Sequence, residues 1–476
     1  MNAEVDFFNN ISYVDEAAKQ PLRKVSVSES VGQPNWRRYT NGAVFRILGA
    51  VAILSILTGA FYFQHFHDFY FPDSSTYVTP AVSLLSGHGF TDIAGDPETV
   101  RTPGYPLFIL LFLWMKLDLK YLVILQHVLR ELIILATTAI TLRVTRSLRQ
   151  ALLAGVFLGI DLPLLEAANS ILTELLFTAV LLCIFWLLWT ESQQQESGWL
   201  RTSATGFLAG ASVLIRPVSL FLFLPITFFL LLTHRTFRFP AVLNFLLCFT
   251  CLPLLWAGRN YSQTGHFTVS SITGMSMLFY RAAGTLAIND PGNFATNLEK
   301  RQQQLQAEAC EEVKGLYPHG CIDFRVPQKE TPDQSEYFTR LGRRIVLQHP
   351  FAYLKLATRG AGLMMLDGGA SSFSRITGLN PHLGLRLLLI YTLPMFCFVV
   401  VGGWHLWRDN RRLFYLSFLL ISYFVIVSAG AEAYSRLRVP IDPICALLAA
   451  AGMEKALMLF QRLKRSFLGR IAIHNL

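Results

Sequence analysis

Charged residues are scarce in this chain. Only 15% of its 476 residues are Asp, Glu, Lys or Arg, whereas a soluble domain carries about a quarter. Hydrophobic residues make up 53% of the chain, and they occur in runs of the length that marks a membrane-spanning helix, ~18 residues or more. The composition therefore excludes an ordinary soluble protein and predicts an all-α polytopic membrane protein.

Other features are missing as well. Residues 1–40 are polar and of mixed charge, so no cleavable signal peptide is expected. We find no internal repeat of the kind common in transporters. Five of the seven cysteines fall within predicted spans, and only Cys310 and Cys321 lie in a predicted outer loop, where an oxidising compartment would permit a disulfide.

Ten apolar segments are predicted to cross the membrane. They are residues 43–63, 122–142, 151–165, 170–189, 204–215, 218–233, 241–257, 385–407, 413–429 and 439–460. Lys and Arg concentrate in alternate short loops, which marks the cytosolic side. This asymmetry predicts cytosolic tails at residues 1–42 and 462–476, in a protein of the plasma (inner) membrane.

Two further apolar segments are predicted to lie at the outer face without crossing it. If residues 102–117 crossed, the arginines that follow residue 142 would lie outside, against the charge asymmetry. Residues 351–366 contain two basic residues and are interpreted in the same way. The predicted organisation is therefore an N-terminal membrane module (43–261) with a first outer loop at 64–121, an outer region (262–384), and C-terminal spans (385–461).

Four arginines lie at the outer ends of predicted spans, against the charge asymmetry: Arg216, Arg259, Arg436 and Arg438. A guanidinium group can grip a phosphate with two hydrogen bonds. Pairing with a local acid or with lipid headgroups is the alternative for each of them. Four acids lie on the same face: Asp73, Asp161, Glu166 and Glu174. Together they suggest a site for an anionic lipid and a proton.

Six short motifs between about residues 63 and 450 resemble one family, in the order in which that family has them. They are Asp73-Ser74-Ser75-Thr76-Tyr77, Thr102-Pro103-Gly104-Tyr105-Pro106, Ser170-Ile171-Leu172-Thr173-Glu174, Leu214-Ile215-Arg216-Pro217, Trp256-Ala257-Gly258-Arg259-Asn260-Tyr261 and Arg438-Val439-Pro440. The set resembles membrane glycosyltransferases of the GT-C superfamily. More narrowly, it is similar to bacterial relatives of the dolichyl-phosphate-mannose protein mannosyltransferases and of the lipid A aminoarabinose transferases.

The resemblance implies a bundle of about ten transmembrane helices with outer interfacial helices, and an inverting transfer of a hexosyl or pentosyl unit. The donor would be a polyprenyl-phosphate-linked sugar at the outer face, and the acceptor an envelope lipid, glycan or protein. The protein mannosyltransferases have two adjacent acids where this chain has Asp73-Ser74, which leaves the acceptor open. No nucleic-acid partner is expected.

The resemblance also assigns roles to residues. Asp73 would be the general base, and Glu174 would position a substrate or the base. Arg438 and Arg259 would hold the donor phosphate, with Arg216, Arg436, Tyr77 and Tyr105 as further substrate-binding residues.

Simpler structural roles remain open for the acids. Asp73 could cap a helix that starts near Ser74, and Glu174 could be a first-turn acid stabilised by a helix dipole. Asp161 and Glu166 could be solvated loop residues.

Three ionisable residues lie inside the second predicted span. His127 and Glu131 are four residues apart and are predicted to pair on one helical face. Arg130 points elsewhere and needs another partner. A buried structural network is the favoured interpretation, and a role towards the donor tail or a proton is the alternative.

A divalent metal ion is left open as a cofactor. The residues with suitable side chains are His65, His67, Asp68 and His88, but their spacing is not diagnostic of any metal.

Two other function classes are considered. A transporter or flippase for an anionic lipid-linked sugar would place charges at the membrane midplane, with broken helices and repeat symmetry. An O-antigen ligase or polymerase would need a strongly basic outer loop, whereas residues 262–350 hold nine acidic and nine basic residues.

Overall fold

The structure is a computed structural model that describes residues 41–194, 198–233, 238–313 and 332–474. Residues 42–476 form one compact unit. Within the described ranges the secondary structure is helical, apart from one isolated bridge between Thr91 and Pro97. The all-helical fold that the composition predicts is therefore confirmed.

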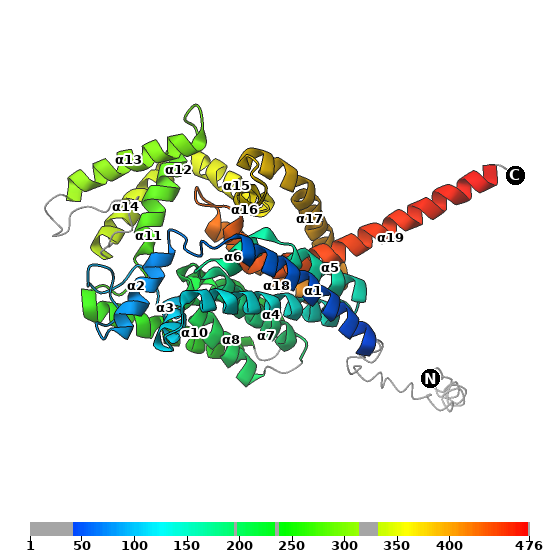
Figure 1. The fold of residues 1–476 in the computed structure, drawn as a ribbon, viewed down its shortest axis with the longest axis horizontal. Coiled ribbons are helices and arrows are strands. Elements are labelled where there is room, and N and C mark those ends of the chain that lie inside the picture. The colour runs from blue at the N-terminus through cyan, green and yellow to red at the C-terminus, as the bar shows by residue number, and fades with distance from the viewer. Residues whose placement is uncertain (1–40, 195–197, 234–237, 314–331, 475–476) are drawn as a thin grey trace, which may run out of the picture. The chain divides into compact units, whose positions relative to one another are not determined.

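The helices are arranged as Figure 1 shows. In chain order they are α1 (Asn41–His65), α2 (Ser74–Leu85), α3 (Gly104–Trp114), α4 (Leu119–Thr145), α5 (Leu148–Gly159), α6 (Leu162–Asn169), α7 (Glu174–Ser192), α8 (Trp199–Ile215), η2 (Pro217–Phe221), α9 (Phe223–Thr233), α10 (Arg238–Thr264), α11 (Ile272–Met275), η3 (Ser276–Ala282), α12 (Ala283–Ala287), α13 (Phe294–Val313), α14 (Pro332–Gln348), α15 (Pro350–Leu366), α16 (Ala370–Thr377), α17 (Pro381–Asp409), α18 (Arg411–Ser428), η4 (Ser435–Ile441) and α19 (Asp442–His474).

Seven of the described helices are long and apolar enough to cross a membrane: α1, α4, α7, α10, α17, α18 and the helix that runs from η4 into α19. The pair α5 and α6, bent by 54°, makes an eighth if it is counted as one span. Helix α8 has 17 residues, and η2 with α9 is likewise a shorter apolar stretch. Each of the ten predicted segments is helical, but the count of ten spans is not confirmed.

Helix α3 is the helical part of the predicted interfacial segment 102–117. Its 11 residues rise ~1.5 Å each, about half of the ~30 Å hydrocarbon core, so it is too short to cross. It packs beside α2 and against the end of α8, where a side chain on Gly104 would overlap the backbone of Leu214. Tyr77 of α2 and Tyr105 of α3 belong to one small apolar core.

The main core lies between the long helices. It contains buried aliphatic and aromatic side chains from α4 to α10 and from α17 to α19. Helices α17 and α19 cross so closely that a side chain on Gly402 or Gly452 would overlap the backbone of the other helix. Small residues at such crossings are typical of helices that associate within a membrane.

Helices α11 to α14 form a second, smaller core of their own, with Phe279 and Phe338 in contact at its centre. They lie together at the left of Figure 1, away from α19. Helix α15 corresponds to the predicted outer segment 351–366. The disulfide considered between Cys310 and Cys321 stays a prediction, because Cys321 lies outside the described residues.

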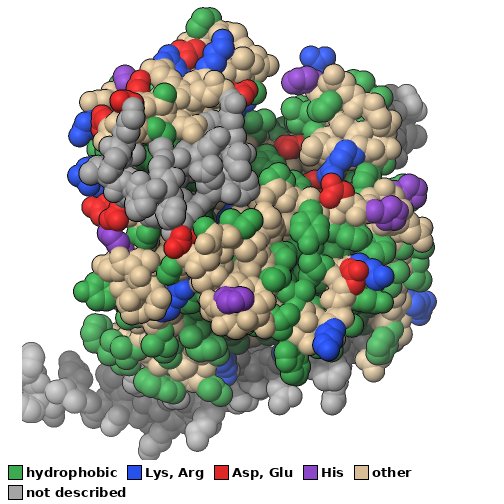
Figure 2. Space-filling model, turned by 60° about the vertical axis from the view of Figure 1, so that its left-hand side comes forward, with side chains coloured by type: hydrophobic (Ala, Val, Ile, Leu, Met, Phe, Trp, Pro, Cys, Tyr) green, Lys and Arg blue, Asp and Glu red, His purple; other side chains and the backbone are tan. Residues whose placement is uncertain are grey.

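The surface is apolar over much of its area. Figure 2 shows one face, on which hydrophobic side chains dominate the lower part and charged side chains are more frequent in the upper part. Large apolar side chains such as Phe45 and Ile53 of α1, Leu247 of α10 and Ile390 of α17 are exposed. Exposed apolar area of this extent fits contact with lipid and not with water.

Candidate active site

Asp73 directly precedes α2, in the position of a helix cap, but its side chain does not cap the helix. Ser74 satisfies the local backbone instead, since its Oγ accepts from Phe71 N at 2.8 Å and donates to Ile171 O at 3.0 Å. The Asp73 carboxylate turns towards Arg101, whose Nη2 lies 3.2 Å from Oδ1, and towards Arg436, whose Nη1 and Nη2 lie 3.1 Å from Oδ2. The capping interpretation is therefore wrong for this side chain.

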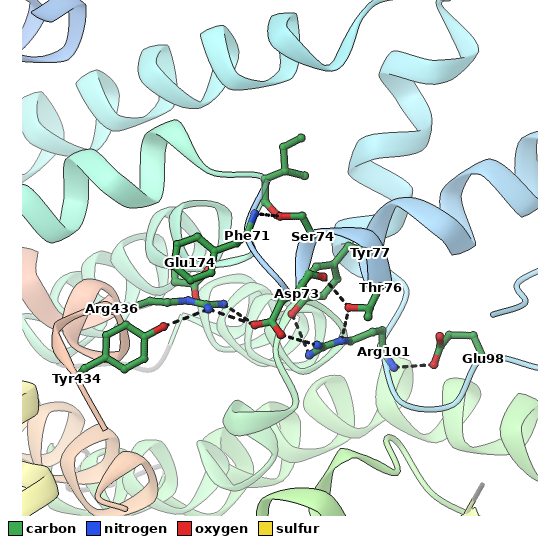
Figure 3. Close-up of polar contacts among 11 residues, drawn as sticks. Phe71, Asp73, Ser74, Thr76, Tyr77, Glu98, Arg101, Glu174, Tyr434 and Arg436 are labelled. Carbon is green, nitrogen blue, oxygen red and sulfur yellow. Dashed lines mark hydrogen bonds and ion pairs between the residues drawn. The ribbon is translucent and has the colours of Figure 1, made fainter. Parts of the chain in front are cut away.

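Arg101 was not singled out by the sequence analysis, although it immediately precedes the Thr102–Pro106 motif. Its Nε donates to Thr76 Oγ1 at 2.9 Å and its Nη1 to Tyr77 OH at 3.2 Å. Glu98 fixes the backbone of the same loop by accepting from Arg101 N at 3.0 Å. Arg101 is thus held on both sides and reaches Asp73 in a defined position (Figure 3).

Glu174 opens α7 and is fully buried. Its Oε1 pairs with Arg436 Nε and lies 2.9 Å from Arg216 Nη1. Figure 3 shows Arg436 between the two acids, with Tyr434 OH 3.3 Å from its Nη1. The structure therefore brings together four of the residues that sequence analysis named: Asp73, Glu174, Arg216 and Arg436.

We call Asp73, Glu174, Arg101, Arg216 and Arg436 the outer charge cluster. Three guanidinium groups against two carboxylates give it one net positive charge. The Asp73 side chain is 39% exposed and that of Glu174 is 0% exposed, while the three guanidinium side chains are 13–17% exposed. Asp73 is thus the accessible carboxylate of the outer charge cluster.

The protonation state of Asp73 follows from its neighbours. Burial raises the pKa of its carboxyl group, but the charges of Arg101, Arg436 and Arg216 outweigh that effect and hold the pKa below its ordinary value of 3.8. Asp73 is therefore ionised at neutral pH and able to accept a proton.

Sequence analysis missed three residues in the neighbourhood of Asp73: Tyr280, Arg281 and Glu432. Tyr280 of η3 lies close enough to Asp73 and Glu432 for both to act on it: burial raises the pKa of its phenol, and the two acids raise it further. Glu432 pairs loosely with Arg281 at 3.9 Å, and its Oε2 has no hydrogen-bond partner. Tyr280 and Arg281 lie in the outer region, which contains none of the six motifs, and Glu432 lies just before the motif at Arg438.

The two tyrosines expected to bind substrate are packing residues in this structure. Tyr77 and Tyr105 contact each other edge to face, with ring centroids 5.5 Å apart. Tyr105 is fully buried, and its OH donates to Gln126 Oε1 at 2.7 Å. Tyr77 supports Arg101, whose guanidinium carbon lies 4.7 Å from its ring centre. The two tyrosines thus support the site by packing.

Arg259 stabilises the first outer loop. Its Nη2 donates to Phe90 O at 2.7 Å and its Nη1 to Glu98 O at 2.8 Å. The guanidinium also lies over the Phe90 and Trp256 rings. This placement gives Arg259 a structural reason to be at the outer face, because it fastens the loop that carries Arg101.

Arg438 lies apart from the outer charge cluster and is fully buried. Its Nε donates to Asp442 Oδ1 at 2.7 Å, its Nη2 to Asp161 Oδ1 at 3.3 Å, and its Nη1 to Met365 O at 2.9 Å. Asp161 also caps α6 by accepting from Leu164 N at 3.0 Å. The expectation that Arg438 grips a phosphate finds no support here, because each of its guanidinium nitrogens is already bonded to the protein.

Glu166 is likewise occupied. It forms an ion pair with Arg375 of α16, a residue that sequence analysis did not consider. The solvated-loop interpretation of Glu166 and of Asp161 is therefore wrong, since both side chains are buried and paired.

The charged residues within α4 form a buried network, but not the one expected. His127 and Glu131 do not pair: His127 Nε2 lies 3.2 Å from Asn169 Oδ1, and Glu131 Oε2 accepts from Ser55 Oγ at 2.5 Å. Arg130 donates to Ser55 O at 2.9 Å and to Gly159 O at 2.8 Å. The three side chains therefore bond to residues of neighbouring helices, which are Ser55 of α1, Gly159 of α5 and Asn169 of α6, and not to one another.

The metal site left open by the sequence is not assembled. No group of three or more His, Cys, Asp or Glu side chains is gathered for an ion within the ranges that the structure describes. His65 Nδ1 contacts its own helix at Phe61 O, and Asp68 accepts from Tyr70 N.

Comparisons with known proteins give a limited result. No family model matches the chain, and no curated protein matches it. Among solved structures, one that is similar is the archaeal oligosaccharyltransferase AglB from Archaeoglobus fulgidus, in complex with an inhibitory peptide and a dolichol-phosphate. The alignment covers 89% of this chain and 52% of the AglB chain, with 14% sequence identity and a TM-score of 0.44. The chain thus spans about half the length of that enzyme.

Two structures of ArnT from Cupriavidus metallidurans are also similar. For the apo form, the alignment covers 85% of this chain and 77% of the ArnT chain, with 13% sequence identity and a TM-score of 0.36. For the form bound to undecaprenyl phosphate, the alignment covers 87% of this chain and 78% of the ArnT chain, with 14% sequence identity and a TM-score of 0.37. At such identities and TM-scores the likeness does not carry a functional assignment, so the function is argued from the residues of this chain.

Proposed function

We propose that this protein is a membrane glycosyltransferase that moves a sugar from a polyprenyl-phosphate-linked donor to an envelope lipid, glycan or protein at the extracytoplasmic face. The support is the ordered set of motifs in the sequence together with the outer charge cluster. The cluster joins a half-exposed, ionised carboxylate to three guanidinium groups that are partly exposed. These are the two functions that the reaction needs, a base and a phosphate-binding group.

In the proposed reaction Asp73 is the general base. The acceptor hydroxyl oxygen attacks the anomeric carbon of the donor sugar from the face opposite the phosphate. The bond between that carbon and the phosphate oxygen breaks, and the polyprenyl phosphate leaves with its electron pair. The proton of the acceptor hydroxyl moves to the Asp73 carboxylate, so atoms and charges balance and the anomeric configuration inverts.

The guanidinium groups stabilise the leaving phosphate. A donor phosphodiester carries one negative charge, which matches the single net positive charge of the outer charge cluster. As the sugar–oxygen bond breaks, a second negative charge develops on the phosphate, and pre-positioned guanidinium donors stabilise it without reorganisation. Arg101, Arg216 and Arg436 are the residues we assign to this role.

Glu174 acts through Arg436 and Arg216 and does not touch substrate. It is fully buried beneath the two guanidinium groups, so it is a positioning residue in this proposal. Its charge holds both guanidiniums at the base of the outer charge cluster and fixes their orientation towards Asp73.

The observation that carries the proposal is that the Asp73 carboxylate leaves its cap position to lie between Arg101 and Arg436. Asp73→Asn tests it, because an amide keeps the size of the side chain but cannot accept a proton. We expect transfer to fall by at least ~100-fold while the protein still reaches the membrane. Asp118→Asn is the matched control, since Asp118 lies in the same outer loop and only caps α4.

The measurement is mass spectrometry of envelope glycans and lipids in a deletion strain that carries each variant. A glycosyl unit should be missing in the deletion strain, restored by the wild type and by Asp118→Asn, and absent with Asp73→Asn. Near-normal restoration by a well-expressed Asp73→Asn variant would remove Asp73 as the base.

A flippase for the lipid-linked sugar is the second candidate, favoured by one observation. The α5–α6 pair breaks by 54° at Asp161, where Arg438 and Asp442 are also buried, and broken helices beside buried charges are typical of transporters. Reconstituted vesicles with a fluorescent lipid-linked sugar separate the two: a flippase moves the lipid across the bilayer without breaking its sugar–phosphate bond.

A further inference from the structure

A groove of about 890 Å³ lies between α14 and the connection from α10 to α11. Arg340, Arg343 and Arg344 line it from α14, and His266 and Thr273 line it from the other side. Its volume is within the usual range of ligand sites, ~300–1,000 Å³. None of these residues belongs to the outer charge cluster.

The two walls of the groove are fastened together. Ser335 of α14 donates from Oγ to Ser271 O at 2.5 Å and accepts from Gly274 N at 3.1 Å. Gly274 and Gly342 pack so closely against the opposite backbone that a side chain on either would overlap it. The spacing of the walls is therefore fixed by contacts that do not involve the groove's charged side chains.

The groove carries unpaired positive charge. Glu336 faces Arg340 at 3.6 Å, in a pair that is exposed on both sides, and Asp333 is engaged by His266 at 2.8 Å. Arg343 and Arg344 form no ion pair with any residue that the structure describes. A solvated basic helix face would have the same charges, but it would not have a second wall fixed opposite them.

The groove also adjoins the loop of the proposed base. Ser270 Oγ donates to Val100 O at 2.6 Å, and Ser271 N donates to Thr99 O at 2.9 Å. The next residue along that loop is Arg101, which pairs with Asp73. A molecule held in the groove therefore lies on the far side of a short, hydrogen-bonded segment from the outer charge cluster.

We propose that this groove binds an anionic saccharide, which under the proposed function is part of the acceptor. Guanidinium groups suit phosphate and carboxylate groups, because they grip them with two hydrogen bonds. The hydroxyl groups of Thr273 and Thr339 line the same groove and can bond to sugar hydroxyls. Only the identification of this saccharide as the acceptor rests on the proposed function. Binding itself can be measured without transfer.

The test is calorimetric titration of the full chain in detergent with two probes. Trigalacturonate offers carboxylates, and glucose 1,6-bisphosphate offers phosphates, so the probe that binds identifies the anionic group. Arg343→Gln and Arg344→Gln should each weaken binding by about 5- to 10-fold, and Arg344→Lys should lose less. Lys300→Gln is the matched control, because it removes an exposed positive charge from α13, outside the groove.

Three outcomes overturn the proposal. These are no binding of either probe by the wild type, equal binding by the double variant Arg343→Gln/Arg344→Gln, and an equal loss in Lys300→Gln. Both arginines are exposed, so the variants should fold, and the melting temperature of each confirms this. Failure of the Asp73 experiment would leave the titration unchanged, so the two proposals fail independently.

Discussion

Arg436→Gln removes the side chain that joins the two acids of the outer charge cluster. Arg436 donates to Asp73 from Nη1 and Nη2 at 3.1 Å and pairs with Glu174 through Nε. The substitution leaves Asp73 with Arg101 and leaves the buried Glu174 with Arg216 at 2.9 Å. We expect a loss of transfer together with a loss of stability, for two separable reasons.

The stability loss can be sized from burial. Removing one partner of a buried ion pair costs about 3–5 kcal/mol, because the other charge stays buried without compensation. Arg216 remains beside Glu174, so the lower end of this range, about 3 kcal/mol, is expected. For a chain of 476 residues, such a loss lowers the melting temperature in detergent by roughly 3 °C. Arg340→Gln is the matched control, since both side chains of its ion pair with Glu336 are exposed, at 69% and 67%, and the pair should contribute less than about 1 kcal/mol.

A second substitution separates the two reasons. Glu174→Gln removes the buried charge, so Arg436→Gln/Glu174→Gln should regain most of the melting temperature. Transfer should stay low in the double variant, because Asp73 and the leaving phosphate still lack Arg436. The reasoning is refuted if Arg436→Gln melts like the wild type, or if transfer returns together with stability in the double variant.

Four further outcomes follow from the same contacts. Arg101 lowers the pKa of Asp73, so Arg101→Gln should raise that pKa and move the acid limb of the pH profile of transfer to higher pH. Arg438→Ala should reduce the yield of folded protein in size-exclusion chromatography, while the folded fraction retains wild-type turnover. Arg259→Ala should lower kcat more than Arg259→Lys, since Lys can still donate to one of the two loop carbonyls. Lys300→Cys should react with a membrane-impermeant maleimide in whole cells; protection from outside would contradict the predicted topology.

The sequence predicted the helical architecture well, because hydrophobic runs and charge asymmetry are local signals. All ten predicted segments became helices, and the segment at 102–117 contains a helix too short to cross. The number of spans was harder to predict. Residues 151–165 look continuous in composition, yet the chain bends at Asp161, whose side chain caps a new helix there.

The outer charge cluster was predicted in part. Asp73, Glu174, Arg216 and Arg436 were named because each lies at the end of a span on the same face. Arg101 was missed because it lies in a loop, where spacing says nothing about distance. Arg436 and Arg438 were treated alike, although two residues apart on a 3₁₀ turn they point to different sides. The spacing of Arg438 and Asp442, four residues apart, was the available signal for their pairing.

The distribution of exposure favours a reaction at Asp73 over transport through the α5–α6 break. A transported anion needs charges that it can reach in turn from each side. The group of Arg438, Asp161 and Asp442 is at most 8% exposed, and carboxylates and carbonyls occupy every guanidinium nitrogen. Opening that group would strip a buried arginine of its partners, at a cost of several kcal/mol. Asp73 is already accessible and ionised beside three guanidiniums, so a donor phosphate and an acceptor hydroxyl can meet there without that cost.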